Sequence, residues 1–333
     1  MQIFIKSIES TGPAAPWLFL TLFLAASVLM IWRLEAMSAG GFEGTVLGTL
    51  VMPYCSGIGN LIFAFVMGRD GGPGADVMTN ALVNNITNMT LLLGLPTLFW
   101  GLRLMPETAP KKKKGKDTGQ SQQLNRLALL LTLMAVLFFT GAVWALGRDG
   151  RLDRNDGLVL VGLFLFWQCF HVFDVLKNNV RQSKSFDWML PVNLLLLGLG
   201  AYAVYLSIEW LVPWLMKKNS GLIHAKYLGW LSGWLMVVPN ALLAFYYGWR
   251  GQPEVTYSSQ VGDGHICIPL GVGIYSLYHT LTVPPMFVSS MMVLLAATGV
   301  HILFVAFLGR LPRLVGLALV AGYGWWLYQG LPR

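Results

Sequence analysis

The stretch "GIGNLIFAFVMG" (57–68) places Asn60 and several glycines inside an apolar run. A second stretch, "VVPNALLAFYYG" (237–248), repeats its pattern Asn-x-(Leu/Ile)-x-Ala-Phe-x-x-Gly. The repeat aligns Asn60 with Asn240, 180 residues later in a chain of 333 residues. A motif that recurs after half a chain predicts two copies of one structural unit.

The composition indicates an all-α integral membrane protein. Hydrophobic residues make up 55% of the chain and charged residues 11%, and the mean hydropathy is +0.60. Soluble domains carry about 25% charged residues, and the apolar segments here exceed the roughly 18 residues that mark a membrane-spanning helix. The expected partners are therefore membrane lipid and small cations. Nucleic acid is not expected, since the net charge of +8 reflects topology.

Apolar stretches and breakers predict about ten transmembrane helices in two membrane repeats, 1–177 and 178–333. The expected spans are 16–34, 43–68, 76–102, 125–147, 157–177, 187–214, 224–249, 260–282, 286–308 and 312–330. Because each half holds five spans, the second half enters the membrane from the opposite side. This predicts inverted repeats, an architecture of many secondary transporters whose substrate sites lie where the repeats meet.

The polar segment 105–124, "MPETAPKKKKGKDTGQSQQL", is expected to be a basic cytoplasmic loop. Basic residues favour the cytoplasmic side, so this loop places both termini outside. The expected location is a bacterial-type inner membrane or plasma membrane, which the chain crosses many times. No basic region followed by a short apolar core and a cleavage site opens the sequence, so the first span is expected to be retained.

Asparagines are concentrated in the third span, "TNALVNNITNMT" (79–90). Asn84 and Asn88 are four residues apart and share one helix face, and Asn85 lies next to it. Polar side chains are costly in lipid, so these must face the bundle interior. Amide carbonyls are hard oxygen donors suited to cations. The alternative is that the asparagines only join helices by hydrogen bonds.

Two further stretches supply candidates for the same site. In the second span, "MPYCSGIGN" (52–60) combines Ser56 and Asn60 with proline and glycine, which disturb the helix and are tolerated where a cavity is lined. In the eighth span, "VGDGHICIPLG" (261–271) carries Asp263 and His265. An ionisable residue inside the membrane predicts function by default. Because Asp263 lies near the start of this span, an interfacial position is the alternative.

The remaining polar groups give weaker signals. The three cysteines, Cys55, Cys169 and Cys267, lack the spacing of a zinc site and are interpreted as small buried hydrophobic residues. No catalytic triad order, zinc-protease motif or phosphate loop stands out. The sequence therefore favours a transporter over an enzyme, with no cofactor or resident metal.

The chain resembles the sodium/calcium exchanger superfamily, whose repeats read G-T-S-L-P-E and then G-S-N-I-x-N or G-S-N-I-x-D. The counterparts here are "CSGIGN" (55–60) with "VNNITNMTLLLGLP" (83–96), and "LMVVPN" (235–240) with "GDGHICI" (262–268). The resemblance implies ten helices in two inverted halves. It also implies a cation bound at the membrane midplane between the second, third, seventh and eighth spans, with alternating access.

The sequence departs from the family pattern at the two glutamates that bind the cation, which fall on Asn60 and Asn240. In the eighth span, either Asp263 takes the serine place and Cys267 that of the acid, or a shift brings in His265. The expected cation-binding residues are Asn60, Asn84, Asn88, Asn240 and Asp263. Ser56, Asn85 and His265 are secondary candidates.

Two missing carboxylates weaken the case for calcium, because a dehydrated Ca²⁺ needs charge compensation that neutral amides do not supply. The resemblance implies Na⁺, Ca²⁺ or another cation as substrate. The missing acids favour a monovalent or proton-coupled substrate, or a changed or lost exchange activity. The alternative function is a non-transporting membrane sensor or scaffold that retains the exchanger fold.

Overall fold

The computed structural model describes residues 2–39, 52–104, 116–179, 189–218 and 223–331. The first half contains α1 (Gln2–Glu9), α2 (Ala15–Ala39), α4 (Met52–Arg69), α5 (Gly74–Ile86), α6 (Leu93–Trp100), α7 (Lys116–Leu146) and α8 (Arg154–Asn179). The second half contains α9 (Leu190–Met216), α10 (Leu228–Trp249), α11 (Pro253–Ile266), α12 (Val272–Tyr278), α13 (Phe287–Leu308) and α14 (Arg313–Gly330). Single 3-10 turns occur at 12–14, 147–149 and 225–227.

Two π-helical turns interrupt the long helices at corresponding places. The first π turn, Thr87–Leu92, joins α5 to α6, and the second π turn, Cys267–Gly271, joins α11 to α12. Four two-residue strands follow the helices: β1 (Leu102–Arg103), β2 (Arg151–Leu152), β3 (Leu281–Thr282) and β4 (Arg310–Leu311). The strands pair antiparallel, β1 with β4 and β2 with β3, so each pair joins the two halves.

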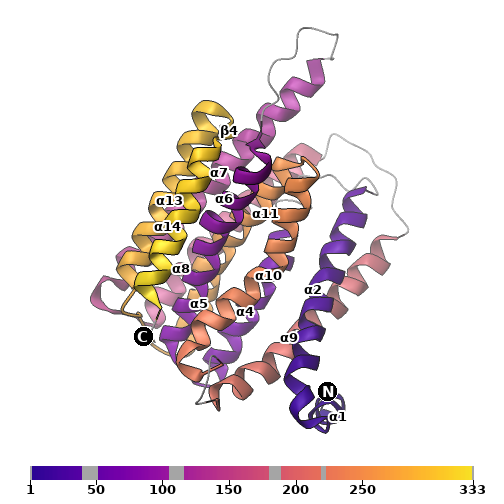
Figure 1. Ribbon diagram of the computed structural model, residues 1–333, viewed down its shortest axis with the longest axis vertical. Coiled ribbons are helices and arrows are strands. Elements are labelled where there is room, and N and C mark those ends of the chain that lie inside the picture. The colour runs from indigo at the N-terminus through magenta and orange to yellow at the C-terminus, as the bar shows by residue number, and fades with distance from the viewer. Residues whose placement is uncertain (1, 40–51, 105–115, 180–188, 219–222, 332–333) are drawn as a thin grey trace.

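The contacts between helices also join the two halves, in matched pairs. α5 packs on α10 while α4 packs on α11, and α6 packs on α14 while α8 packs on α12. The pairs α2–α9 and α7–α13 each join equivalent helices. Figure 1 shows α2 and α9 at one side of the bundle, α13 and α14 at the other, and α4, α5, α10 and α11 between them.

Glycines make two of these crossings equally close. A Cβ at Gly94 on α6 would lie 2.9 Å from the Gly316 carbonyl oxygen on α14. A Cβ at Gly157 on α8 would lie 3.0 Å from the Gly273 carbonyl oxygen on α12. Such backbone contact between helices is open only to residues without a side chain. The paired crossings support the two-copy organisation that the sequence predicts.

The surface of the bundle is apolar, as a lipid environment requires. Phe307 and Leu314 are 79% and 80% exposed, and large side chains of this kind cover most outward helix faces. Six helical segments of the described chain are long and apolar enough to span a membrane: Gly12–Leu34, Gly74–Trp100, Arg126–Asp149, Pro191–Met216, Ala225–Trp249 and Phe287–Leu308. The protein is therefore an integral, multi-pass membrane protein.

Two predicted boundaries differ from the structure. Of the predicted loop 105–124, residues 116–124 form the first turns of α7, because lysine, glutamine and leucine favour the helix and extend the hydrogen-bond ladder of the apolar span. The predicted span 260–282 begins earlier, since α11 starts at Pro253. Residues 43–51 of the predicted span 43–68 and 105–115 of the loop lie outside the described residues.

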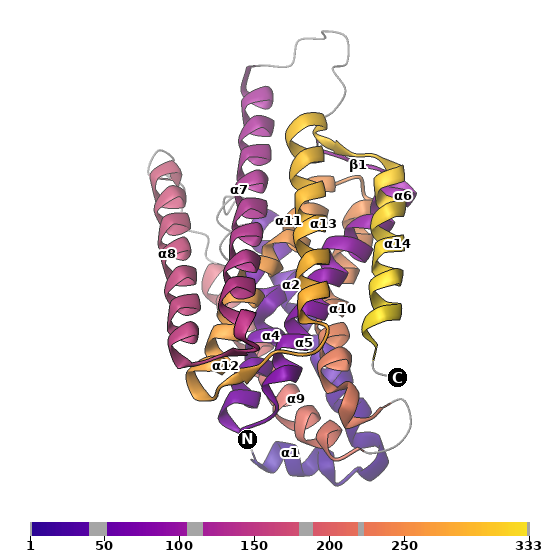
Figure 2. The same cartoon turned by 90° about the vertical axis from the view of Figure 1, so that its left-hand side faces the viewer.

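The termini lie toward one end of the molecule. Figures 1 and 2 place α1 and the end of α14 toward the end of the bundle opposite the start of α7. This arrangement agrees with a loop and termini on opposite sides. Which side faces outward stays a prediction.

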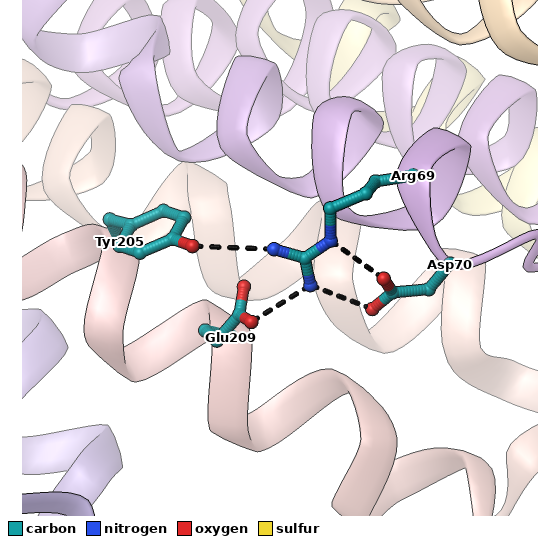
Figure 3. Close-up of polar contacts among 4 residues, drawn as sticks. All are labelled: Arg69, Asp70, Tyr205 and Glu209. Carbon is teal, nitrogen blue, oxygen red and sulfur yellow. Dashed lines mark hydrogen bonds and ion pairs between the residues drawn. The ribbon is translucent and has the colours of Figure 1, made fainter. Parts of the chain in front are cut away.

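Polar contacts at the end of α4 tie α9 to the centre of the bundle (Figure 3). Arg69 donates Nε to Asp70 Oδ1 at 2.7 Å and Nη2 to Glu209 Oε1 at 2.8 Å. Arg69 Nη1 also lies 3.3 Å from the hydroxyl of Tyr205, one turn before Glu209 on α9. The corresponding end of α10 differs, since Arg250 there stacks over Tyr246 at 4.9 Å.

Removing one member of this group should cost little stability. The Arg69 and Glu209 side chains are 35% and 19% exposed, and partly solvated ion pairs contribute about 0–1 kcal/mol. We expect Glu209→Gln to lower the free energy of unfolding by about 1 kcal/mol or less. Thermal unfolding of the purified protein in detergent measures this. A loss on the order of 3–5 kcal/mol would instead show a fully desolvated pair.

Candidate cation site

Four central helices and both π turns converge on one buried carboxylate. Asp263 lies on α11, has no solvent-exposed surface, and is the only acid among the fully buried described residues. It is the eleventh residue of α11, about 15 Å along the helix from Pro253 at 1.5 Å per residue. The earlier start of α11 thus puts Asp263 deep in the bundle.

Asparagines from three elements surround one oxygen of this carboxylate. Asn88 of the first π turn donates its amide Nδ2 to Asp263 Oδ2 at 2.9 Å, and Asn240 of α10 donates at 3.1 Å. Asn84 of α5 donates to the same oxygen. The other oxygen, Oδ1, accepts from the Cys267 thiol of the second π turn at 3.3 Å. All these donors are neutral, so the negative charge is solvated but not balanced.

The π turns show how the two halves align with each other. In the first π turn the Leu93 N–H bonds the Thr90 carbonyl, and in the second the Val272 N–H bonds that of Pro269. This equivalence pairs Asn84 with Asp263 and Asn88 with Cys267. Of the two alignments that the sequence left open, the geometry selects the one without His265.

α10 is held at Asn240 through its backbone as well as its side chain. Gln260, one turn before Asp263 on α11, donates Nε2 to the Asn240 backbone carbonyl at 3.0 Å and to Ser259 Oγ at 3.0 Å. The preceding residue, Pro239, lies inside α10. Gln260 therefore fixes the height of Asn240 relative to the carboxylate.

The α4 helix closes the site on its remaining side. Asn60 is 3% exposed and lies beside the Cys267 thiol, yet neither of its amide atoms makes a hydrogen bond with a described residue. A Cβ at Gly57 would lie 2.8 Å from Asp263 Oδ1 and 3.2 Å from Cys267 Sγ. The α4 backbone thus lies against the carboxylate, and only glycine allows that approach.

Amide oxygens around the carboxylate are left without partners. The Oδ1 atoms of Asn60, Asn84, Asn88 and Asn240 are buried and accept no hydrogen bond from the described residues. A buried acceptor without a donor is costly, so these oxygens are available to a ligand that carries positive charge. One carboxylate with several amide oxygens is a hard-oxygen donor set suited to an alkali or alkaline-earth cation. Among the described residues, no group of three His, Cys, Asp or Glu could hold a metal ion.

The structure separates the predicted candidates into two groups. It brings Asn84, Asn88, Asn240 and Asp263 into direct contact and puts Asn60 beside them. The secondary candidates lie differently: Asn85 donates to the Ala81 carbonyl of its own helix at 2.7 Å. His265 is two residues after Asp263, about 200° around α11, and so points away from the carboxylate. Ser56 lies in α4, but its side chain is outside the described residues.

Three residues of the site were not among the expected cation-binding residues. Cys267 was interpreted as a small buried hydrophobic residue, and one alignment put it in the place of the family acid; its position four residues after Asp263 signals a shared face. Gly57 and Gln260 act through backbone approach and backbone bonding. The sequence gives no sign of these two roles beyond the presence of a glycine and a glutamine inside apolar spans.

Substituting Gly57 tests the contact between α4 and the carboxylate. We expect Gly57→Ala to destabilise the protein by about 1–3 kcal/mol, because a new Cβ must displace a carboxylate held by four donors. The matched control is Gly141→Ala on α7, where nothing lies within 4 Å of a new Cβ. That change should stabilise the helix by up to about 1 kcal/mol. Equal unfolding temperatures for the two variants would contradict the predicted contact.

Comparisons with known proteins agree with this fold. The family model of sodium/calcium exchanger proteins matches residues 14–173, and none of the curated protein sequences matches the chain. The structure of the sodium-calcium exchanger NCX_Mj soaked with 2.5 mM Na⁺ and 10 mM Sr²⁺ is 20% identical and covers 100% of both chains, with a TM-score of 0.64.

Two other structures of NCX_Mj give similar values. The one soaked with zero Na⁺ and Ca²⁺ is 20% identical over 100% of both chains, with a TM-score of 0.63. The one soaked with 2.5 mM Na⁺ and 0.1 mM Ca²⁺ is 20% identical over 95% of this chain and 97% of that chain, with a TM-score of 0.61. At this identity the likeness shows the fold. The chain is thus similar to sodium/calcium exchanger proteins, through the family model over residues 14–173 and through the fold over its whole length.

Proposed function

We propose that the protein is a secondary active transporter that binds a monovalent cation at Asp263 and works by alternating access. The observation that carries this proposal is a single buried carboxylate whose hydrogen-bond donors are all neutral. Charges buried in a protein are expected to be paired, coordinated to a metal or neutralised by a proton. Asp263 therefore takes either a cation or a proton.

The charge of the site favours a monovalent ion over Ca²⁺. One carboxylate balances Na⁺ fully but leaves one positive charge on Ca²⁺ in a low-dielectric interior. The similar structures are those of a sodium-calcium exchanger soaked with Na⁺ and Sr²⁺ or Ca²⁺. In this chain the two positions that the family fills with glutamate hold Asn60 and Asn240. We therefore assign Na⁺, in competition with H⁺, as the substrate.

The asparagines supply the ligands through a change of side-chain orientation. As hydrogen-bond donors, Asn84, Asn88 and Asn240 stabilise the free carboxylate. Turned over about the bond to the amide, they present their unpartnered Oδ1 atoms instead. A cation between those oxygens and Asp263 then replaces the three N–H donors. An amide cannot donate to Asp263 and coordinate the cation at the same time. Ion binding is therefore coupled to a local rearrangement of the amides.

The two-copy organisation supports alternating access. The pairings α5–α10 with α4–α11, and β1–β4 with β2–β3, support two halves related by a pseudo-two-fold axis in the membrane plane. The carboxylate lies where the second and third helices of both halves meet. On this proposal, rocking of the halves exposes Asp263 first to one side and then to the other.

Cation-dependent stabilisation of the purified protein tests the binding step. A ligand that binds only the folded state stabilises it by RT ln(1 + [L]/Kd), so the unfolding temperature rises with the logarithm of its concentration once the site is filled. We expect Na⁺ to stabilise the protein more than equal concentrations of choline, which controls for ionic strength, and more than Ca²⁺. Equal unfolding temperatures with all three salts would overturn cation binding and favour a membrane sensor or scaffold.

A further inference from the structure

A second buried series of hydrogen bonds lies next to the site without reaching Asp263. The hydroxyl of Tyr257 on α11 lies 2.5 Å from Nδ1 of His301 on α13. The other ring nitrogen, Nε2, lies 2.7 Å from the backbone carbonyl of Met89 in the first π turn. Tyr257, His301 and Met89 are all fully buried. These hydrogen bonds therefore link α11 and α13 to the residue that follows Asn88.

The acceptors fix the direction of every hydrogen bond in this series. A backbone carbonyl only accepts, so His301 Nε2 carries the proton that it shares with Met89. In the neutral ring Nδ1 is then an acceptor, and the Tyr257 hydroxyl donates to it. Each polar atom of the imidazole has one partner of the correct kind. The ring is thus locked in one tautomer and one orientation.

The π turn changes the backbone pairing around the Met89 carbonyl. In a regular α-helix the Leu93 N–H would bond the Met89 carbonyl, but here it bonds that of Thr90. The His301 ring donates to the Met89 carbonyl, whose usual α-helical donor has moved to Thr90. The adjacent residue, Asn88, carries one of the amides that reach Asp263. The position of that amide therefore depends on the shape of the turn.

Proline interrupts the helix ladder within the second π turn, but in the first half it stands after the turn, at Pro96 of α6. The residue of the second π turn equivalent to Thr90 is Pro269, which has no N–H and so interrupts the helix ladder by itself. Thr90 has an ordinary backbone, and its hydroxyl bonds the Ile86 carbonyl at 2.5 Å. Among the described residues, the side chain that bonds the backbone of the first π turn from a neighbouring helix is His301.

We propose that His301, oriented by Tyr257, is a positioning residue that holds the first π turn in the shape that the cation site requires, and thereby sets the affinity for the cation. This inference rests on the proposed function, since the affinity concerned is that of the site around Asp263. His301 itself contacts no ligand. It acts through the Met89 carbonyl on Asn88.

The test compares three variants by the apparent Kd for Na⁺, the concentration that half-fills the site, fitted from the stabilisation RT ln(1 + [Na⁺]/Kd). His301→Leu removes the donor and should raise this concentration about tenfold or more, since loss of an outer partner of a metal ligand costs roughly 10- to 100-fold in affinity. His301→Gln keeps an N–H near the position of Nε2 and should remain close to wild type. Tyr257→Phe removes only the orienting hydroxyl and should lie between the two.

The matched control is Thr298→Val, one turn before His301 on α13. Thr298 is equally buried, and its hydroxyl bonds the Leu294 carbonyl of its own helix at 2.7 Å. It should leave the half-saturating concentration unchanged, even if stability falls. The proposal is overturned if His301→Leu keeps the wild-type value, or if His301→Gln loses as much affinity as His301→Leu. A wild-type protein that shows no Na⁺ response at all would instead refute the proposed function.

Discussion

The variant Asp263→Asn should lose all cation-dependent stabilisation while remaining folded. The substitution keeps the size of the side chain but removes the one fully buried negative charge in the described chain. Breaking a buried charge interaction by removing one partner costs about 3–5 kcal/mol. This corresponds to a loss of cation affinity on the order of a hundred- to a thousandfold or more. Thermal unfolding of the two proteins across a series of Na⁺ concentrations measures the difference.

The stability of Asp263→Asn without added cation shows whether the variant loses only cation binding or also loses its fold. An uncompensated buried carboxylate is costly, so a neutral amide in its place should leave the basal unfolding temperature unchanged or raise it. Glu209→Gln makes the same chemical change outside the site, where the carboxylate bonds Arg69, and should keep the Na⁺ response. An Asp263→Asn protein that Na⁺ still stabilises would place the ion elsewhere.

The variant Asn240→Asp should shift the preference of the site toward divalent cations. Its Nδ2 lies 3.1 Å from Asp263 Oδ2, so the new carboxylate would stand directly against the existing one. Two like charges at this distance repel each other in a low-dielectric interior. We expect the protein without divalent ions to be destabilised by about 3–5 kcal/mol, the cost of an unpaired buried charge. Ca²⁺ should restore this stability, because two carboxylates balance its charge.

The matched control for this variant is Asn80→Asp. Asn80 is nearly as buried as Asn240, but it donates to Ser232 Oγ at 3.0 Å and not to Asp263. A carboxylate there should destabilise the protein without a selective gain from Ca²⁺. If both variants respond equally to Ca²⁺, the effect is not specific to the carboxylate pair. If Ca²⁺ does not stabilise Asn240→Asp, the number of carboxylates does not set the preference for monovalent or divalent cations.

Much of the central arrangement could be predicted from residue spacing. The 180-residue offset of Asn60 and Asn240 indicated two copies, and the spacing of Asn84 and Asn88 indicated a shared face. These are local regularities, and helix geometry converts them directly into position. Asp263 was recognised because an acid in an apolar span is rare. Its depth was left open because the polar first turns of α11 carry no hydropathy signal.

The rest depends on contacts between distant segments. A π turn changes the backbone pairing by one residue without a characteristic sequence, so the match of Asn88 with Cys267 required coordinates. The approach of Gly57 to the carboxylate and the bond from His301 to Met89 join elements more than 200 residues apart. Secondary candidates such as Asn85 and His265 were suggested by residue type alone. The direction of their side chains separates them from the site.

Ion flux in reconstituted vesicles directly measures whether the protein transports Na⁺ and whether transport requires Asp263. Vesicles containing the wild-type protein are given an inward Na⁺ gradient or an inward Ca²⁺ gradient, with internal pH and ion content recorded, and Asp263→Asn vesicles serve as the control. We expect Na⁺ uptake coupled to H⁺ release, little Ca²⁺ uptake, and no flux with Asp263→Asn. Rapid Ca²⁺ uptake by the wild type, or equal Na⁺ flux in wild-type and Asp263→Asn vesicles, would contradict this expectation.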